Sequence, residues 1–357
     1  MKRVKVDLSI VSVISVVSII LISLYSTSHQ IFASSERGDD EHDDGNSKFV
    51  ILTFDDGYKS QYTNVKPILE KYGYKGTFYV VCNYAQTEDE DRMNWNELQE
   101  LQKQGHDIES HSMSHAHLTE IPAYRMDIEI GVSKQCLVSR GFNVTSFAYP
   151  FAVGSQNKSI VDTVAKYYSL GRSADAPLMF LDCNGWDNSD DEIENDISLT
   201  LVSSGNKYDD AGCREYSNNG SLNAVNRYSI MGWTHDSERR YKQYNDSQML
   251  ERFIEVVEGQ SKYNYDEKIS AIPIIIWHNI EDNNTTDSHT TTSTNLFEAE
   301  IKYLHDNGFT VLTMDDLVYD EYDNSLKIKE GKNNSDTITS VINQVDYSEG
   351  VDYDGKT

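Results

Sequence analysis

Basic residues are scarce in this chain of 357 residues, where 31 lysines and arginines stand against 58 aspartates and glutamates. The formal net charge of −27 at pH 7 repels phosphate groups, which argues against nucleic acids and anionic lipid surfaces as partners. Cysteine is scarce as well, and the four copies show no C-x-x-C spacing, which argues against a zinc site built from cysteines. A neutral or cationic substrate suits such a surface better than an anionic one.

The longest apolar stretch, residues 8–25, lies close to the N-terminus and carries no charge. Lys2, Arg3 and Lys5 precede it, and this order predicts a signal peptide or a signal anchor over residues 1–33. The stretch is long for a cleaved signal and near the minimum for a membrane span, so both alternatives stay open. Either one predicts that the rest of the chain is exported, to be secreted or held at the cell surface by one transmembrane segment.

Three further parts of the chain differ in composition. Residues 34–47 form an acidic run that we expect to be a disordered tether, and residues 321–357 form a polar C-terminal tail. Between them, residues 48–320 alternate strand-like with helix-like segments, which predicts an α/β domain with a parallel sheet or barrel. A polar segment at about 180–226 interrupts this alternation, and we interpret it as an insertion.

The alternation defines the expected elements. Strands are predicted at 49–54, 76–82, 107–110, 145–148, 168–172, 228–232, 272–277 and 310–313, and helices at 65–71, 95–103, 123–139, 158–167, 247–258 and 295–306. Four cysteines allow three disulfide pairings. Cys183 and Cys213 lie in the polar insertion and are predicted to pair, whereas Cys82 and Cys136 lie in apolar settings and are expected to be buried thiols.

Two adjacent carboxylates, Asp55 and Asp56, follow the apolar run at 49–54, and Gly57 can supply a tight turn after them. Ligands of α/β folds bind beyond the C-terminal ends of strands. Side chains alternate along extended backbone, so the two aspartates should diverge. One of them can then bind a metal while the other faces a substrate or a water. A solvated acidic turn is the alternative interpretation.

A pair of histidines, His111 and His115, follows the strand predicted at 107–110. Positions i and i+4 of one helical turn face the same way, so both imidazoles can share a metal. Two nitrogens and one carboxylate oxygen suit zinc with an open coordination position. Together with Asp56, this pair predicts a metal site of the kind that a hydrolase uses to activate water.

These residues resemble the motifs of the polysaccharide deacetylases, carbohydrate esterase family 4 with its NodB-homology domain. The family's first motif, T-F-D-D-G, is matched at residues 53–57, and its second, H-[ST]-x-x-H, at residues 111–115. The resemblance covers about residues 48–319 and implies an irregular (β/α) barrel. It also implies removal of N-acetyl groups from a polysaccharide that contains N-acetylglucosamine. The cofactor would be a divalent metal ion, for which Zn²⁺ is the first candidate.

The resemblance assigns roles residue by residue. Asp55 would be the catalytic base, and Asp56, His111 and His115 would be the metal ligands. The family's fifth motif, L-x-H at a strand end, is matched by residues 276–278, so His278 would be the acid that protonates the leaving amine. A core histidine that caps a buried strand is the alternative interpretation of His278.

The third and fourth motifs depart from the family's pattern. Where the family often has R-x-P-[YF], the segment Ala148-Tyr149-Pro150-Phe151 lacks the arginine that is thought to orient the base. Tyr149, Pro150 and Phe151 remain candidates for substrate and oxyanion binding through the Phe151 N–H.

A cation for the base can come from elsewhere in the chain. Arg172, at the end of the strand predicted at 168–172, either replaces the missing arginine or is a solvated surface residue. Asp175 lies at a plausible distance for the fourth motif but lacks its tryptophan, so this motif stays unassigned. Asp175 is kept with Arg172 as a candidate for orienting the base.

The leading hypothesis is therefore an exported, metal-dependent deacetylase of an acetylated glycan. Two alternatives remain: hydrolysis of another acylated glycan or small amide, and a cell-surface glycan-binding protein that has lost catalysis. The alanine at position 148 supports the last alternative, and retention of Asp55, the metal ligands and His278 argues against it.

Overall fold

The structure is a computed structural model, and it describes residues 47–87, 89–174, 176–181, 227–265, 268–282, 290–322 and 324–331. Residues 8–25, most of the expected tether and insertion, Asp175, and the cysteines at 183 and 213 lie outside the described residues. Within the described ranges, no helix combines the length and the hydropathy needed to cross a membrane.

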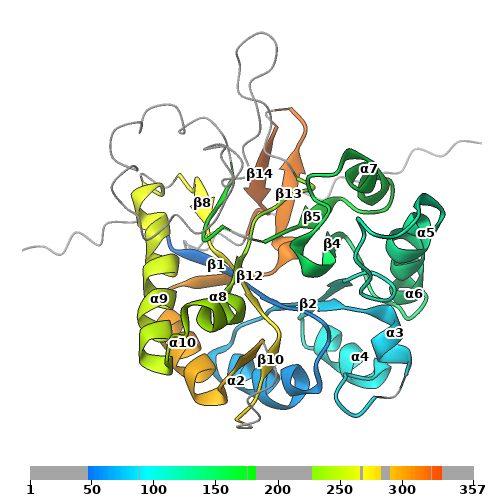
Figure 1. Ribbon diagram of the computed structural model, residues 1–357. Coiled ribbons are helices and arrows are strands. Elements are labelled where there is room, and N and C mark those ends of the chain that lie inside the picture. The colour runs from blue at the N-terminus through cyan, green and yellow to red at the C-terminus, as the bar shows by residue number, and fades with distance from the viewer. Residues whose placement is uncertain are drawn as a thin grey trace, which may run out of the picture. The chain divides into compact units, whose positions relative to one another are not determined.

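A parallel sheet forms the centre of the fold, with β1 (Phe49–Phe54) in its middle. The strands follow the order β5-β4-β3-β2-β1-β9-β7, and β12 pairs with the first half of β1. Their bounds are β2 Thr77–Val80, β3 Asp107–Ser110, β4 Ser146–Ala148, β5 Leu170–Arg172, β7 Trp233–Thr234, β9 Ile274–Trp277 and β12 Thr310–Leu312. The predicted parallel arrangement is confirmed (Figure 1).

The two edges of this sheet meet. Arg172 of β5 pairs in parallel with Ile230, which lies three residues before β7. The N–H of Ile230 donates to the carbonyl of Gly171 at 2.8 Å, and the N–H of Ser173 donates to the carbonyl of Ile230 at 2.7 Å. The sheet therefore curls into an irregular barrel, as expected. The strand predicted at 228–232 is replaced by this bridge and by β7 further along.

Alternation along β1 divides the core into two layers. Phe49 and Ile51 belong to one buried cluster together with residues of β4, β5 and β9, which is the barrel interior. Val50, Leu52 and Phe54 belong to a second cluster that includes the apolar faces of the helices. Because side chains alternate along a strand, the next interior positions after Ile51 are 53 and 55. The carboxylate at position 55 thus enters the barrel at its C-terminal end.

Helices cover the outside of the sheet (Figure 1). They are η1 Gln61–Val65 with α2 Lys66–Tyr72, α3 Cys82–Gln86, α4 Trp95–Lys103, α7 Lys158–Tyr167, α8 His235–Lys242, α9 Asp246–Glu258 and α10 Thr294–Asp306. One continuous helical stretch comprises α5 Ala123–Asp127, a turn of π-helix η2 Ile128–Val132, and α6 Ser133–Val138. Asparagine side chains accept N–H hydrogen bonds at the starts of α4, α7 and α9, where four N–H groups have no helical partner.

The C-terminal part of the described chain extends past residue 320, where the polar tail was expected to begin. β13 (Leu317–Asp320) pairs antiparallel with β14 (Ser325–Ile328). Leu317 and Leu326 are buried in the same cluster as the barrel interior. This apolar contact places the hairpin within the domain, because a solvated tail has no such burial.

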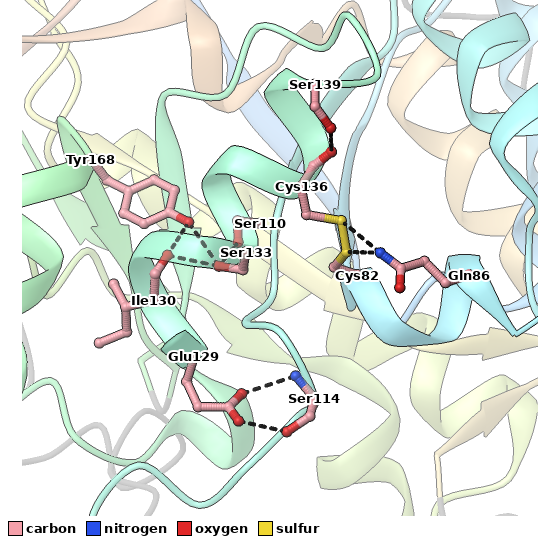
Figure 2. Close-up of a disulfide and its surroundings, with 10 residues drawn as sticks. All are labelled: Cys82, Gln86, Ser110, Ser114, Glu129, Ile130, Ser133, Cys136, Ser139 and Tyr168. Carbon is pink, nitrogen blue, oxygen red and sulfur yellow. Dashed lines mark hydrogen bonds between the residues drawn. A yellow bond between two sulfur atoms is a disulfide. The ribbon is translucent and has the colours of Figure 1, made fainter. Parts of the chain in front are cut away.

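A disulfide joins Cys82 of α3 to Cys136 of α6, 54 residues apart in sequence (Figure 2). The expectation that these two are separate buried thiols is wrong. The reason is tertiary: α6 packs against β3 and α3, and this contact brings two apolar segments together. Local composition does not reveal such a contact.

Candidate active site

Three side chains converge beyond the C-terminal ends of β1 and β3. Oδ1 of Asp56 lies 3.5 Å from Nε2 of His111 and 3.2 Å from Nε2 of His115. One ligand atom from each residue lies within 4.8 Å of the other two. Oδ1 of Asp56 is buried and has no hydrogen-bond partner among the described residues. A buried carboxylate oxygen without a donor fits a cation ligand, so the residues present suit a divalent metal.

The orientation of His111 supports this assignment. Its Nδ1 lies 2.9 Å from the carbonyl oxygen of Ala148, to which it can only donate. Nε2 is then left with a lone pair that faces Asp56. Histidine ligands of metals are oriented in this way by a hydrogen bond to their second nitrogen. Burial lowers the pKa of His111 and outweighs the nearby Asp55 and Asp56 carboxylates, which favours the neutral, ligating form.

The two imidazoles come together through a loop, not through the helical turn that the spacing suggested. Residues 111–117 have no helical assignment, and both Ser112 (φ 68°) and His115 (φ 60°) adopt left-handed backbone. The N–H of His115 donates to Oγ of Ser112 at 2.9 Å. Asp56 (φ 71°) and Gly57 (φ 68°) are left-handed too, so both ligand segments turn sharply at their strand ends. The expected tight turn at Gly57 is present.

Asp55 diverges from Asp56 and points into the barrel. Its Oδ1 accepts a hydrogen bond from the Arg172 guanidinium, and its Oδ2 lies 3.8 Å from Nε2 of His111. Burial raises the pKa of Asp55, but Arg172, His111 and His278 together hold it below its ordinary value. The structure therefore places a buried carboxylate beside the metal ligands, and its lowered pKa favours the charged form, which can accept a proton.

Arg172 of β5 supplies a cation that an arginine on the neighbouring strand β4, at the position of Ala148, could also have supplied. It is 2% exposed, so the solvated-surface interpretation does not describe it. Arg172 of β5 and Ala148 of β4 are register partners. The side chain of an arginine at position 148 or at position 172 therefore enters the barrel interior at the same height along the strands. The Arg172 guanidinium also lies over the ring of Tyr79, 4.7 Å from its centroid.

His278 follows β9 and is held by a carboxylate that the sequence interpretation missed. Asp236, in the first turn of α8, lies 3.0 Å and 3.1 Å from Nδ1 of His278 and accepts from its backbone N–H at 2.9 Å. Burial opposes the positive charge of His278, but Asp236, Asp55 and Asp56 raise its pKa to about 9. The imidazole is therefore protonated at neutral pH, with Nε2–H left to donate.

The signal for Asp236 in the sequence is weak. It lies 42 residues before His278 and belongs to none of the motifs described above. Asp175 itself lies outside the described residues. The one indication of Asp236 in the sequence is a carboxylate shortly after a strand.

The residues at 149–151 have two different surroundings: Tyr149 is buried in the protein, and Phe151 lies at the exposed edge of the site. Tyr149 is buried, and its hydroxyl donates to the carbonyl of Tyr228 at 2.9 Å, so its side chain faces the protein and does not fit the expected contact with substrate. Phe151 (φ 58°) follows Pro150 in a tight turn and is 48% exposed. Its ring lies 4.3 Å from that of His115 between centroids. Phe151 thus forms a wall of the metal site, and the oxyanion role of its N–H stays a prediction.

Residues 42–169 match the family model described as polysaccharide deacetylase. This segment is similar to the polysaccharide deacetylases. The matched segment contains both motifs at 53–57 and 111–115 and the turn at 149–151, whereas Arg172, Asp236 and His278 lie beyond it.

Similarity to individual polysaccharide deacetylases is partial. YxkH of Bacillus subtilis, a protein assigned by name to the polysaccharide deacetylases, is 28% identical over 125 residues, which cover 35% of this chain and 44% of YxkH. The solved Streptococcus pyogenes deacetylase PplD in complex with acetate is 26% identical over 35% of this chain and 55% of its own, with a TM-score of 0.34.

A third relative is similar over a longer stretch. The Xyl-CE4 domain of a xylanase from the hindgut metagenome of Trinervitermes trinervoides is 17% identical over 76% of this chain and 89% of its own, with a TM-score of 0.43. The chain spans less than half the length of YxkH, so its activity is inferred below from its own residues.

Proposed function

We propose that this chain is an exported, metal-dependent hydrolase that removes N-acetyl groups from a polysaccharide containing N-acetylglucosamine. One observation carries the proposal: a three-residue ligand set lies beside Asp55, and His278 is near enough that Asp55 and Asp56 raise its pKa. Amide hydrolysis needs a base for the attacking water and an acid for the leaving amine. The raised pKa of His278 favours the protonated form that an acid needs, and the lowered pKa of Asp55 keeps it in the deprotonated form that a base needs.

Asp56, His111 and His115 would hold the metal, for which Zn²⁺ suits the donor set of two nitrogens and one oxygen. The ion would supply Lewis acidity toward the acetyl carbonyl and toward water. Asp55 takes the proton of the attacking water, and Arg172 keeps that carboxylate charged and oriented. His278 donates its Nε2 proton to the sugar nitrogen as the carbon–nitrogen bond breaks, which yields acetate and a free amine.

The proposal also includes export of the protein and the class of its substrate. The charged start of the chain and the apolar stretch at 8–25 support a secreted or membrane-anchored protein. The net charge of −27 supports a neutral glycan whose product is cationic. A glycan-binding protein without catalysis was the competing hypothesis, and its main support was Ala148. Arg172 supplies the cation that Ala148 cannot, so that support is weakened.

The test is acetate release from acetylated chito-oligomers by the purified chain with its metal content measured. Asp55→Asn should retain the metal and lose about 10²–10⁴ in rate, the usual contribution of a positioned base. Asp162→Asn is the matched control, because it removes one exposed carboxylate on α7 that pairs with Lys158. Tight glycan binding with no acetate released from any acylated glycan by the wild-type protein would contradict the proposal.

A further inference from the structure

The residue before each histidine ligand is anchored to one helix. Ser110 precedes His111, and its hydroxyl donates to Oγ of Ser133 at 3.0 Å. Ser114 precedes His115, and its N–H and hydroxyl donate to the carboxylate of Glu129 at 2.9 Å and 2.7 Å. Figure 2 shows Glu129 facing Ser114 from the helical stretch that also carries Ser133.

The spacing of these contacts matches on both sides. Ser110 ends β3, and Ser114 lies in the loop four residues later. Glu129 and Ser133 are four residues apart on the helix, so the two acceptors lie on one helical face. We call the four residues Ser110, Ser114, Glu129 and Ser133 the serine ladder. Its two rungs fix the backbone immediately before each metal ligand.

Burial gives the Glu129 rung its strength. Glu129 is 1% exposed, and a buried carboxylate is unfavourable unless donors surround it. Ser114 supplies two of those donors, and the guanidinium of Arg125 supplies a third at 2.9 Å. The carbonyl of Glu129 also accepts from the N–H of Met113 at 3.0 Å. Glu129 therefore depends on the loop for its hydrogen bonds as much as the loop depends on Glu129.

The loop is also held from its opposite side. The N–H groups of Cys82 and Asn83 in α3 donate to the carbonyls of Ser112 and Met113 at 3.3 Å and 2.9 Å. The disulfide from Cys82 to Cys136 ties α3 to the helix that carries the serine ladder (Figure 2). The loop thus contacts two helices, α3 and the helix 123–138, which are joined to each other by the disulfide.

Such anchoring is needed because the loop is strained. Ser112 and His115 are left-handed, a conformation that residues with a Cβ adopt only when their surroundings impose it. A released loop would relax toward ordinary backbone angles, and His115 would turn away from Asp56. Apparent metal affinity falls in proportion to the fraction of molecules that keep the competent geometry.

We propose that Glu129 and Ser133 are positioning residues that set the metal affinity of this protein through Ser114 and Ser110. The inference rests on the metal site of the proposed function. It assigns to the helix 123–138 a role in ligand geometry in addition to its packing against the sheet.

The experiment measures Zn²⁺ affinity of the metal-free, disulfide-bonded full chain by competition with a chromophoric chelator. Ser114→Ala, Ser133→Ala and Glu129→Gln should each bind Zn²⁺ about 10–100-fold more weakly, the usual effect of removing a partner of a ligand segment. Ser139→Ala is the matched control, because Ser139 donates to the carbonyl of Cys136 at the end of the same helix and does not contact the loop (Figure 2).

Three readouts separate the outcomes. Hydrogen exchange at residues 111–117 should speed up in the ladder variants and not in Ser139→Ala. Zn²⁺ affinities of Ser114→Ala and Ser133→Ala within two-fold of wild type would overturn the ladder, even if Glu129→Gln fails to fold. A wild-type chain that takes up no divalent ion would overturn the proposed function and the ladder together, whereas a metal-binding chain without acetate release would overturn the proposed function alone.

Discussion

Replacing Arg172 by methionine tests the central ion pair of the site. Arg172→Met keeps much of the side-chain volume but leaves Asp55 as a buried charge with one partner fewer. Both side chains are nearly inaccessible, at 2% for Arg172 and 4% for Asp55. Breaking a buried pair by removing one partner typically lowers the free energy of unfolding by about 3–5 kcal/mol. We expect that loss at pH 7.

The sign of the pH dependence follows from the two pKa directions. In the wild-type protein the pKa of Asp55 is held below its ordinary 3.8, so the pair stabilises the fold above that pH and loses its effect as the pH falls through the lower folded value. Without Arg172, burial should raise the pKa of Asp55. Protonation then removes the unpaired charge in acid, so the destabilisation should shrink as the pH falls.

The assay is urea denaturation of Arg172→Met, Asp55→Asn and the double variant at several pH values. The double variant should recover most of the lost stability, to within about 1–2 kcal/mol of wild type, since it leaves no unpaired charge. Arg172→Ala combined with Ala148→Arg should restore part of the acetate release. A single Arg172→Met variant within about 0.5 kcal/mol of wild type at every pH would refute the reasoning.

Two further perturbations probe the acid and the disulfide. Asp236→Asn should lower the pKa of His278 from about 9 toward or below its ordinary 6.5 and move the basic limit of kcat/KM to lower pH, as an NMR titration and a pH profile would show; an unchanged titration would contradict the assignment. The raised pKa also means that this pair stabilises the fold below about pH 6.5 and loses that effect as the pH rises through 9. Replacing Cys82 and Cys136 by serine should lower the free energy of unfolding by about 4 kcal/mol, from the chain-entropy relation for a separation of 54 residues, and equal urea midpoints would exclude a stabilising role.

The sequence predicts well those parts of the molecule that depend on local pattern. The apolar run at 49–54 and the short strand predicted after a helix at 107–110 both have the bounds that were expected. Asp55 and Asp56 diverge at the strand end because alternation of side chains is a property of extended backbone. The convergence of Asp56 with His111 and His115 followed from combining two motifs, each of which is weak alone.

Other parts depend on which strands become neighbours, and spacing does not encode this. Arg172 replaces a missing arginine because β4 and β5 pair in the register that aligns it with Ala148. Asp236 reaches His278 because β7 pairs with β9 and α8 begins directly after β7. The loop at 111–115 has left-handed residues instead of a helical turn, and its conformation is set by contacts with α3 and Glu129.

The barrel closes where β5 meets Ile230, and this closure involves Arg172, the residue that orients the base. Elsewhere in the ring, assigned strands pair with one another, whereas at this point β5 is joined through an isolated bridge to a residue outside any strand. Proteins open locally where pairing is sparse, before they unfold as a whole. Gentle warming should therefore separate Arg172 from Asp55 while the rest of the sheet holds, so that the protein would lose turnover at a lower temperature than it loses its fold.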